Sequence, residues 1–348
     1  MPTRKLGIPV IVLLTAASLV VGACGADTSG NDGGPEEPET EGITLYSGRI
    51  PAAIGGAVDI YEAAADRDVQ VRFADTADLA ATIVEEGKNS PADVFFAQEP
   101  GAIGAVAAEG LLEKLPDDIL KRVPAAYRDP NGYFVGVTGR ARIIAYSEDV
   151  PRSELPDSPF ELTDPKWKGR VGWGPATASL QQFVTALRIQ YGDDRTREWL
   201  EGMVENDAVD YPNNVAIRDA IANGEIDLGL INHYYVAQAI AAEGPDYPVK
   251  VHFPPEGLGS LVLTTSVGVL ASSDRKDEAI DFVRSLLAKP SQEFFTSSSK
   301  EYPLARDVEP DPSLTIPLED IPTPPPGDLF DVTQLQETIE MMEEAGAL

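Results

Sequence analysis

The chain of 348 residues is poor in the side chains that most enzymes use for nucleophilic and acid–base chemistry. It has 1 cysteine and 2 histidines, so no disulfide can form within the chain and little imidazole is present for proton transfer. It also lacks the Gly-x-Ser-x-Gly elbow of hydrolases, the His-Glu-x-x-His of zinc peptidases and the Gly-Lys-Ser/Thr of phosphate loops. These absences exclude the common enzyme signatures, and we expect that the chain is not an enzyme.

Positive charge is scarce as well. Lys and Arg number 27 against 57 Asp and Glu, which gives a formal net charge of −30. Because so acidic a chain is repelled by DNA, RNA and anionic lipid, we expect no nucleic-acid partner. Apolar residues make up 43% of the chain, which suits a globular protein, and the length favours two domains over a single core. We expect a monomer.

Only the N-terminus carries a long hydrophobic run. Arg4 and Lys5 precede an almost unbroken apolar stretch over Ile8–Val21, which is short for a membrane span but typical of a signal peptide. The run ends in Val21-Gly-Ala-Cys24, which resembles the bacterial lipobox, where the signal is cleaved just before the cysteine. The pattern predicts a signal peptide over residues 1–23.

The single thiol, Cys24, is therefore expected to carry lipid. Acyl chains on Cys24 would hold the protein on the outer face of the cytoplasmic membrane without spanning it. The stretch that follows, residues 24–42, is rich in Gly, Pro, Glu, Asp, Ser and Thr and has no apolar periodicity, so it predicts a flexible acidic tether. The folded body is expected to start near Ile43.

Short apolar runs alternate with helical patterns in the first part of the body. This order predicts a parallel sheet with helices on both faces, in which ligands bind beyond the carboxyl ends of the strands. The expected strands are Ile43–Tyr46, Val69–Phe73 and Val94–Phe96, and the expected helices are Ala52–Ala65, Ala77–Gly87 and Gly101–Glu109.

A second unit of the same kind is expected from about Gly139. Leu261–Leu270 is a long β-rich run and a candidate for a strand that crosses back to the first unit. The other expected strands are Ile143–Tyr146 and Ile226–Ile231, and the expected helices are Leu180–Tyr191, Val215–Ala222, Tyr234–Ala242, Asp277–Leu287 and Gln334–Ala345.

The strongest local signal for chemistry is a pair of adjacent tyrosines, Tyr234 and Tyr235, at a strand-to-helix junction. Asn232 is expected to cap the helix, and in its first turn both phenols can lean toward one point beyond the strand. Phenolate oxygen is a hard, anionic ligand that suits a hard trivalent cation. From these residues alone, two half-buried aromatics at the start of a helix are the more ordinary interpretation.

Several longer motifs, in unbroken order from about Ile43 to Pro303, resemble the ferric-ion-binding solute-binding proteins of bacterial ABC importers. The resemblance implies an α/β, two-lobed periplasmic-binding-protein type II clamshell with crossing hinge strands, in which residues 43–138 and 266–315 form lobe 1 and residues 139–265 and 316–348 form lobe 2. The motifs are Tyr46-Ser-Gly-Arg49, Ser90-Pro-Ala-Asp-Val-Phe-Phe-Ala-Gln98, Thr138-Gly-Arg-Ala-Arg-Ile-Ile-Ala-Tyr146, Pro165-Lys-Trp-Lys-Gly-Arg-Val-Gly172, Asn223-Gly-Glu-Ile-Asp-Leu-Gly-Leu-Ile-Asn-His-Tyr-Tyr235 and Glu301-Tyr-Pro303.

The resemblance also implies a ligand set. Tyr234 and Tyr235 match the two iron-binding tyrosines of the family. An exogenous anion, phosphate or carbonate, would be held on the metal by residues that match the family's anion site or could assist it: Thr177, Ala178, Ser179, Asn214, Asn232 and Arg142. Ordinary helix capping is the alternative for the threonine and serine. Arg49 and Arg140, like Arg142, could hold the anion or bridge the lobes, and salt bridging is the alternative for all three.

The chain departs from the family pattern in the first lobe. Ile50 stands where the family often has a metal-ligating histidine, and Pro51 where a subset has a third tyrosine. Gln98 aligns with the family's carboxylate ligand, so Glu99 is the expected replacement, with a solvated carboxylate at a helix start as the alternative. We expect neither of the two histidines, His233 and His252, to be a ligand.

The resemblance thus implies an extracytoplasmic lipoprotein that captures Fe(III) as cargo and delivers it to an ABC permease and its ATPase. Two alternatives remain open. In the first, the same fold binds a phosphorylated solute, an anion or an organic iron chelate, because the first lobe lacks its usual ligands. In the second, the fold serves as an adhesin or sensor without transport.

Overall fold

A computed structural model describes residues 42–314, 316–322 and 334–348. The signal peptide, Cys24 and nearly all of the expected tether therefore lie outside the described residues. The described residues belong to one compact unit. Among them, no helix is both long enough and apolar enough to cross a membrane.

The first part of the chain forms three parallel strands with helices between them. Strand β1 pairs in parallel with both β2 and β3, which confirms the expected parallel arrangement. The strands are β1 (Gly42–Ser47), β2 (Asp68–Phe73) and β3 (Val94–Ala97), and the helices are α1 (Pro51–Ala65), α2 (Thr76–Glu86), α3 (Pro100–Ala108) and α4 (Asp117–Arg122).

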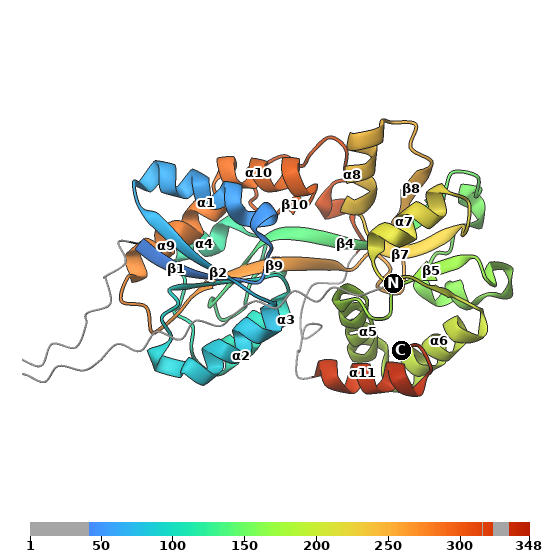
Figure 1. The fold of residues 1–348 in the computed structure, drawn as a ribbon, viewed down its shortest axis with the longest axis horizontal. Helices are drawn as coiled ribbons and strands as arrows, with labels where there is room; N and C mark the ends of the chain where they lie inside the picture. Colours follow the sequence, from blue (N-terminus) through green and yellow to red (C-terminus); the bar gives the residue numbers. More distant parts are fainter. Residues whose placement is uncertain (1–41, 315, 323–333) are drawn as a thin grey trace, which may run out of the picture. The chain divides into compact units, whose positions relative to one another are not determined.

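Alternation along β3 divides the apolar core of this region into two layers. Val94 and Phe96 pack into a cluster with the buried residues of α1 and of α9 (Lys276–Leu286). Phe95 and Ala97 point to the other face and pack with α2 and α3. The period of two along a strand thus places helices on both faces of the sheet, as Figure 1 shows for α1 and α2.

The second group of parallel strands lies later in the chain. Strand β5 pairs in parallel with β6 and with β7. The strands are β5 (Val171–Trp173), β6 (Val209–Asp210) and β7 (Leu228–Asn232), and the helices are α5 (Ala178–Tyr191), α6 (Asp193–Glu205), α7 (Asn214–Ala222), α8 (Tyr234–Glu243) and α11 (Leu335–Glu344). The buried residues of α5, α6 and α11 share one apolar cluster, and those of α7 and α8 share another.

Two long antiparallel strands, β4 (Val135–Ser147) and β9 (Val262–Val269), join the two groups (Figure 1). Strand β9 pairs with β3 on its other side, and β4 pairs with β7, so the sheet order runs β2-β1-β3-β9-β4-β7-β5-β6. The remaining elements are β8 (Val249–His252) and β10 (Tyr302–Pro303), which both pair with β4, and α10 (Lys289–Ser299).

Most expected elements are confirmed, but one strand is longer than expected and further helices are present. The strand expected from Ile143 begins at Val135 and is continuous through Gly139, near which the second unit is expected to start. Helices α4, α6 and α10 were not expected. Helix α10 begins at Lys289-Pro290, because proline is tolerated in the first helical turn.

Candidate functional site

The two tyrosines lie side by side where β7 ends and α8 begins. The ring centroids of Tyr234 and Tyr235 are 4.2 Å apart at an interplanar angle of 34°. Both side chains are partly exposed. The expected cap is wrong, because His233 occupies the N-cap position and Asn232 is the last residue of β7.

Asn232 instead belongs to a buried cluster around Arg142 of β4. The guanidinium, in a residue only 1% exposed, donates from Nη1 to the side-chain oxygens of Ser179 (3.2 Å), Asn214 (3.4 Å) and Asn232 (3.3 Å). Its Nη2 donates to the carbonyl of Leu230 at 2.9 Å. Arg142 therefore contacts three other residues that are expected to bind an anion.

Arg142 retains one unused donor. Its Nε is buried and has no hydrogen-bond partner among the described residues. Burial lowers the pKa of Arg142 to about 10, and negative charge on Tyr234 and Tyr235 would oppose this shift. At neutral pH the guanidinium is therefore positively charged next to the tyrosine pair, which is the environment that an anion requires.

Thr177 and Ala178 lie at the start of α5, next to this cluster. Thr177 is the N-cap: its hydroxyl accepts from the Leu180 amide at 3.4 Å and donates to the Gly174 carbonyl at 2.6 Å. Capping, the alternative considered from the sequence, is thus observed for Thr177. Ala178 is the first residue of the helix and is exposed.

A second polar group lies where β3 ends. Glu99 is only 8% exposed, although it occupies the N-cap position of α3, so a solvated carboxylate does not describe it. Its Oε1 accepts from Gln98 Nε2 at 2.7 Å and lies 3.8 Å from Nη2 of Arg140. Arg140 also donates to the Gln98 carbonyl, while its own Nε is buried without a partner among the described residues.

Glu301, just before β10, is a buried carboxylate that the sequence reasoning did not assign to the site. It is 1% exposed, accepts two hydrogen bonds from Arg49 (2.7 and 3.2 Å), and accepts another from the Thr138 hydroxyl. Burial acts to raise the pKa of Glu301, but the charges of Arg49 and Arg140 outweigh it and hold this pKa below its ordinary value. The only signal in the sequence was the family-like motif Glu301-Tyr-Pro303.

Two of these charged groups, Glu301 and Arg140, act electrostatically on Tyr234. Burial raises the pKa of Tyr234 above the ordinary tyrosine value, the neighbouring Tyr235 and Glu301 add to the rise, and Arg140 opposes it. Tyr234 is therefore a neutral phenol at physiological pH unless a cation binds its oxygen. Within the described chain, no three His, Cys, Asp or Glu side chains form a metal-binding group, so a metal here would depend on the tyrosines.

The remaining candidates do not offer ligands. Ile50 is 68% exposed and Pro51 starts α1. His233 is buried with both ring nitrogens in hydrogen-bond contact with backbone groups, and His252 Nε2 lies 2.8 Å from the Pro156 carbonyl. Both histidines are therefore engaged in structural contacts.

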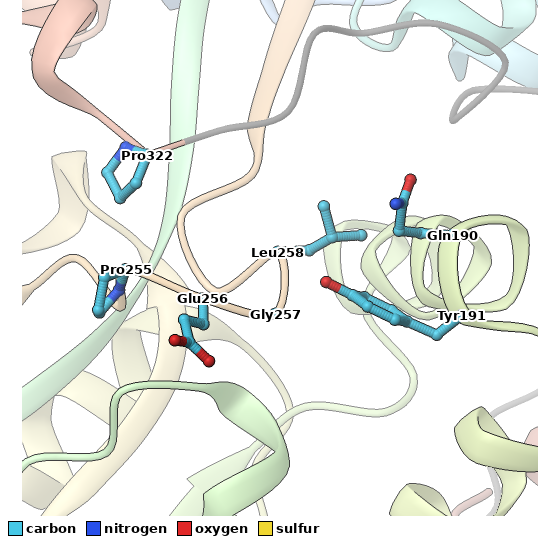
Figure 2. A pocket seen from close by; sticks show the side chains of 7 residues that line it. All are labelled: Gln190, Tyr191, Pro255, Glu256, Gly257, Leu258 and Pro322. Atoms are coloured by element: carbon cyan, nitrogen blue, oxygen red, sulfur yellow. The ribbon is translucent and has the colours of Figure 1, made fainter.

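A pocket of about 300 Å³ lies elsewhere, and Figure 2 shows its lining. The end of α5 (Gln190 and Tyr191), residues 255–258 and Pro322 surround it. None of these residues belongs to the expected site. Apart from Glu256, no charged side chain of the described residues lines the pocket, so among them it lacks the convergent polar groups that mark a specific anion or metal site.

Comparison with known proteins places this arrangement in a family. Residues 89–320 match the family described as "Bacterial extracellular solute-binding protein". The major ferric iron-binding protein of Neisseria meningitidis serogroup B is 32% identical over 323 residues, which cover 89% of this chain and 94% of the relative.

Comparison with solved structures gives the same kind of match. Iron-bound HitA from Pseudomonas aeruginosa superposes with a TM-score of 0.78 at 31% identity, covering 87% of this chain and 99% of that one. The Trichodesmium protein in complex with iron and citrate gives a TM-score of 0.76 at 27% identity, covering 88% and 99%. These matches confirm the expected type II periplasmic-binding-protein fold. The chain belongs to the family of bacterial ferric iron-binding extracellular solute-binding proteins, and it is a binding protein rather than an enzyme.

Proposed function

We propose that this chain captures Fe(III) outside the cytoplasm through the phenolates of Tyr234 and Tyr235 and delivers it to an ABC permease. The observation that carries the proposal is the pairing of the two rings at 4.2 Å beside the buried, positively charged Arg142. Ferric ion is a hard cation that favours anionic oxygen ligands. The relatives named for ferric iron binding support the choice of cargo.

An exogenous anion completes the proposed site. Arg142 with Ser179, Asn214 and Asn232 would hold it, and Thr177 and Ala178 would contribute through the N-terminus of α5, where backbone amides favour negative charge.

The charges of the site favour a dianion. Three arginines (49, 140 and 142) and two carboxylates (99 and 301) leave one positive charge. A ferric ion with two phenolates adds one more. Carbonate or hydrogen phosphate, each carrying two negative charges, would therefore balance the site. This balance of charge matters because the buried part of the site has a low dielectric constant, where an uncompensated charge is costly.

Glu99 is proposed as the ligand from the first lobe. It is buried and it lies near Arg140, whose charge also acts on Tyr234. A carboxylate with a hydrogen-bond donor at Gln98 could turn one oxygen to the metal while the other stays bonded. With Ile50 exposed and non-coordinating, the first lobe would supply fewer ligands than the histidine-containing pattern does.

We also propose the lobe boundaries stated above, residues 43–138 with 266–315 and residues 139–265 with 316–348. The apolar packing along the two long strands supports them. On β4, Val135 and Val137 pack with the β1–β3 region, whereas Ala141 and later residues pack with the region of β5 and β7. On β9 the same change occurs between Leu263 and Val267.

The proposed mode of delivery is that of a monomeric lipoprotein held to the outer face of the cytoplasmic membrane by lipid on Cys24. The apolar run before this cysteine and the acidic stretch after it support the proposal. Metabolic labelling with a radioactive fatty acid tests it: label should enter the wild-type protein and be absent from Cys24→Ala. Equal labelling of both proteins would refute the anchor.

An anionic iron chelate is the second candidate cargo. The three arginines, the departures at Ile50 and Gln98, and the similarity to the Trichodesmium protein in complex with iron and citrate favour it over a metal-free solute. Equilibrium competition against nitrilotriacetate, with carbonate, phosphate or citrate added in turn, tests both. Tight iron binding with carbonate or phosphate supports the first proposal. Iron binding only with citrate supports the chelate. No iron binding with any of the three anions refutes both candidate cargoes.

A further inference from the structure

His233 forms hydrogen bonds from both sides of its ring. Its Nδ1 accepts from the backbone amide of Ala141 at 3.1 Å, and its Nε2 lies 3.0 Å from the carbonyl of Lys300. Because an amide donor requires a lone pair on Nδ1, the ring proton resides on Nε2 and is donated to Lys300. The His233 backbone amide also donates to the Ala141 carbonyl at 3.0 Å, so histidine and alanine are joined twice.

These contacts connect three segments that are far apart in the sequence and all contribute to the proposed site. His233 directly precedes the tyrosine pair, and Ala141 lies between the two arginines of β4. Lys300 directly precedes Glu301, the carboxylate that binds Arg49. One imidazole therefore links the segments that carry the proposed ligands, the arginines of β4 and the buried carboxylate.

Packing leaves the ring little freedom to tilt. The residue is 2% exposed, and its ring stacks on Tyr302 with centroids 4.8 Å apart at 30°. The Tyr302 ring is itself buried, and its hydroxyl donates to the Ile316 carbonyl at 2.8 Å. On the other side, Tyr234 meets the imidazole edge-to-face at 5.9 Å and 88°.

We propose that His233 is a positioning residue of the iron site: it binds no metal, but it holds Tyr234 and Tyr235 in register with the β4 arginines and with Glu301. This inference rests on the proposed function of the tyrosine pair. Metal sites generally depend on such supporting groups, and their loss costs about ten- to a hundredfold in metal affinity.

Three variants separate positioning from simple packing. His233→Phe keeps a ring for the stack on Tyr302 but loses both hydrogen bonds. His233→Asn can still accept from Ala141, and His233→Gln can still donate to Lys300. His252→Gln is the matched control, since it changes the other histidine, on β8, whose Nε2 contacts the Pro156 carbonyl at 2.8 Å.

The readouts are the iron dissociation constant and the wavelength of the tyrosinate-to-iron absorption band, measured on variants that melt cooperatively. We expect His233→Phe to weaken iron binding about tenfold or more and to shift the band, the Asn and Gln variants to be intermediate, and His252→Gln to match the wild type. If His233→Phe fails to fold, the Asn and Gln variants provide the test.

Folded variants with wild-type iron affinity and band wavelength would overturn the positioning role alone. Absence of the band from the wild type would overturn the proposed function and this inference with it.

Discussion

Arg49 and Glu301, 252 residues apart in the chain, form a two-point ion pair in which Nη2 and Nη1 donate to the two carboxylate oxygens at 2.7 and 3.2 Å. The Glu301 side chain is only 1% exposed and that of Arg49 is 11% exposed. The pair joins the turn after β1 to the segment before β10. The Thr138 hydroxyl of β4 also donates a hydrogen bond to Glu301. A buried pair of this kind is costly to break, because the partner that remains keeps an uncompensated charge.

Glu301→Gln is therefore expected to destabilise the metal-free protein by about 3 kcal/mol, since it leaves Arg49 buried without its counter-charge. Denaturant unfolding measures the loss. Asp307→Asn is the control: Asp307 pairs with Arg122 at 3.2 Å on the surface, where an ion pair contributes about 0.5 kcal/mol. Equal losses in the two variants would contradict the role assigned to Glu301.

Arg142→Lys should reduce the dependence of iron binding on the anion. A lysine presents a single point charge and cannot reproduce the planar fork that contacts Ser179, Asn214 and Asn232. Iron affinity measured with and without phosphate should differ strongly in the wild type and less in the variant. Arg170→Lys, at an exposed ion pair with Asp227, should retain the wild-type response, and a full response in Arg142→Lys would count against the anion site.

Iron binding should release a proton from Tyr234. Burial raises the pKa of this phenol above its ordinary value, so it is protonated across the physiological range and must lose the proton to bind as phenolate. Apparent affinity should then rise with pH by about tenfold per unit for each proton released. Proton release on adding ferric nitrilotriacetate, followed in weakly buffered solution, should be one proton lower in Tyr234→Phe. Identical release would mean that Tyr234 does not bind the metal as phenolate.

The metal-free protein should lose stability as the pH falls from about 6.5 toward 4. Burial lowers the pKa of His233 from 6.5 to about 4, with Glu301 opposing and Arg140 adding to this shift, so between these values the unfolded chain binds a proton that the folded chain does not. The loss is on the order of 3 kcal/mol. His233→Asn should show a shallower pH dependence over this window in denaturant unfolding, and an unchanged slope would contradict a neutral buried imidazole.

Much of the fold could be predicted because its signals are local. The apolar runs of β1, β3 and β9 and the amphipathic pattern of α9 give strand and helix assignments within a few residues of those observed. Helix α6 was missed although Trp199, Leu200 and Met203 form its buried face, because polar residues dominate the rest of it. Helix α10, which begins at Lys289-Pro290, was also not predicted.

The only site residues that could be predicted from the sequence are those covered by the resemblance to the family. The family-like motifs, and the resemblance that they carry, predicted Tyr234, Tyr235 and the residues that contact Arg142 as candidates for the site. They gave no physical reason to connect Glu301 with Arg49 or His233 with Lys300, because these contacts join segments that come together only in the folded chain. Asn232 shows the same limit: locally it suits a helix cap, but in the fold its side chain bonds Arg142 across neighbouring strands.

The most direct test of the proposed iron site is the visible spectrum of the mature, metal-free protein during ferric titration with carbonate or phosphate present. Phenolate coordination predicts a tyrosinate-to-iron charge-transfer band that grows to one equivalent of iron and is lost in Tyr234→Phe/Tyr235→Phe, while Tyr191→Phe, at the end of α5, keeps it. A wild-type protein that shows no band with either anion, or a band that survives the double substitution, would contradict the central claim.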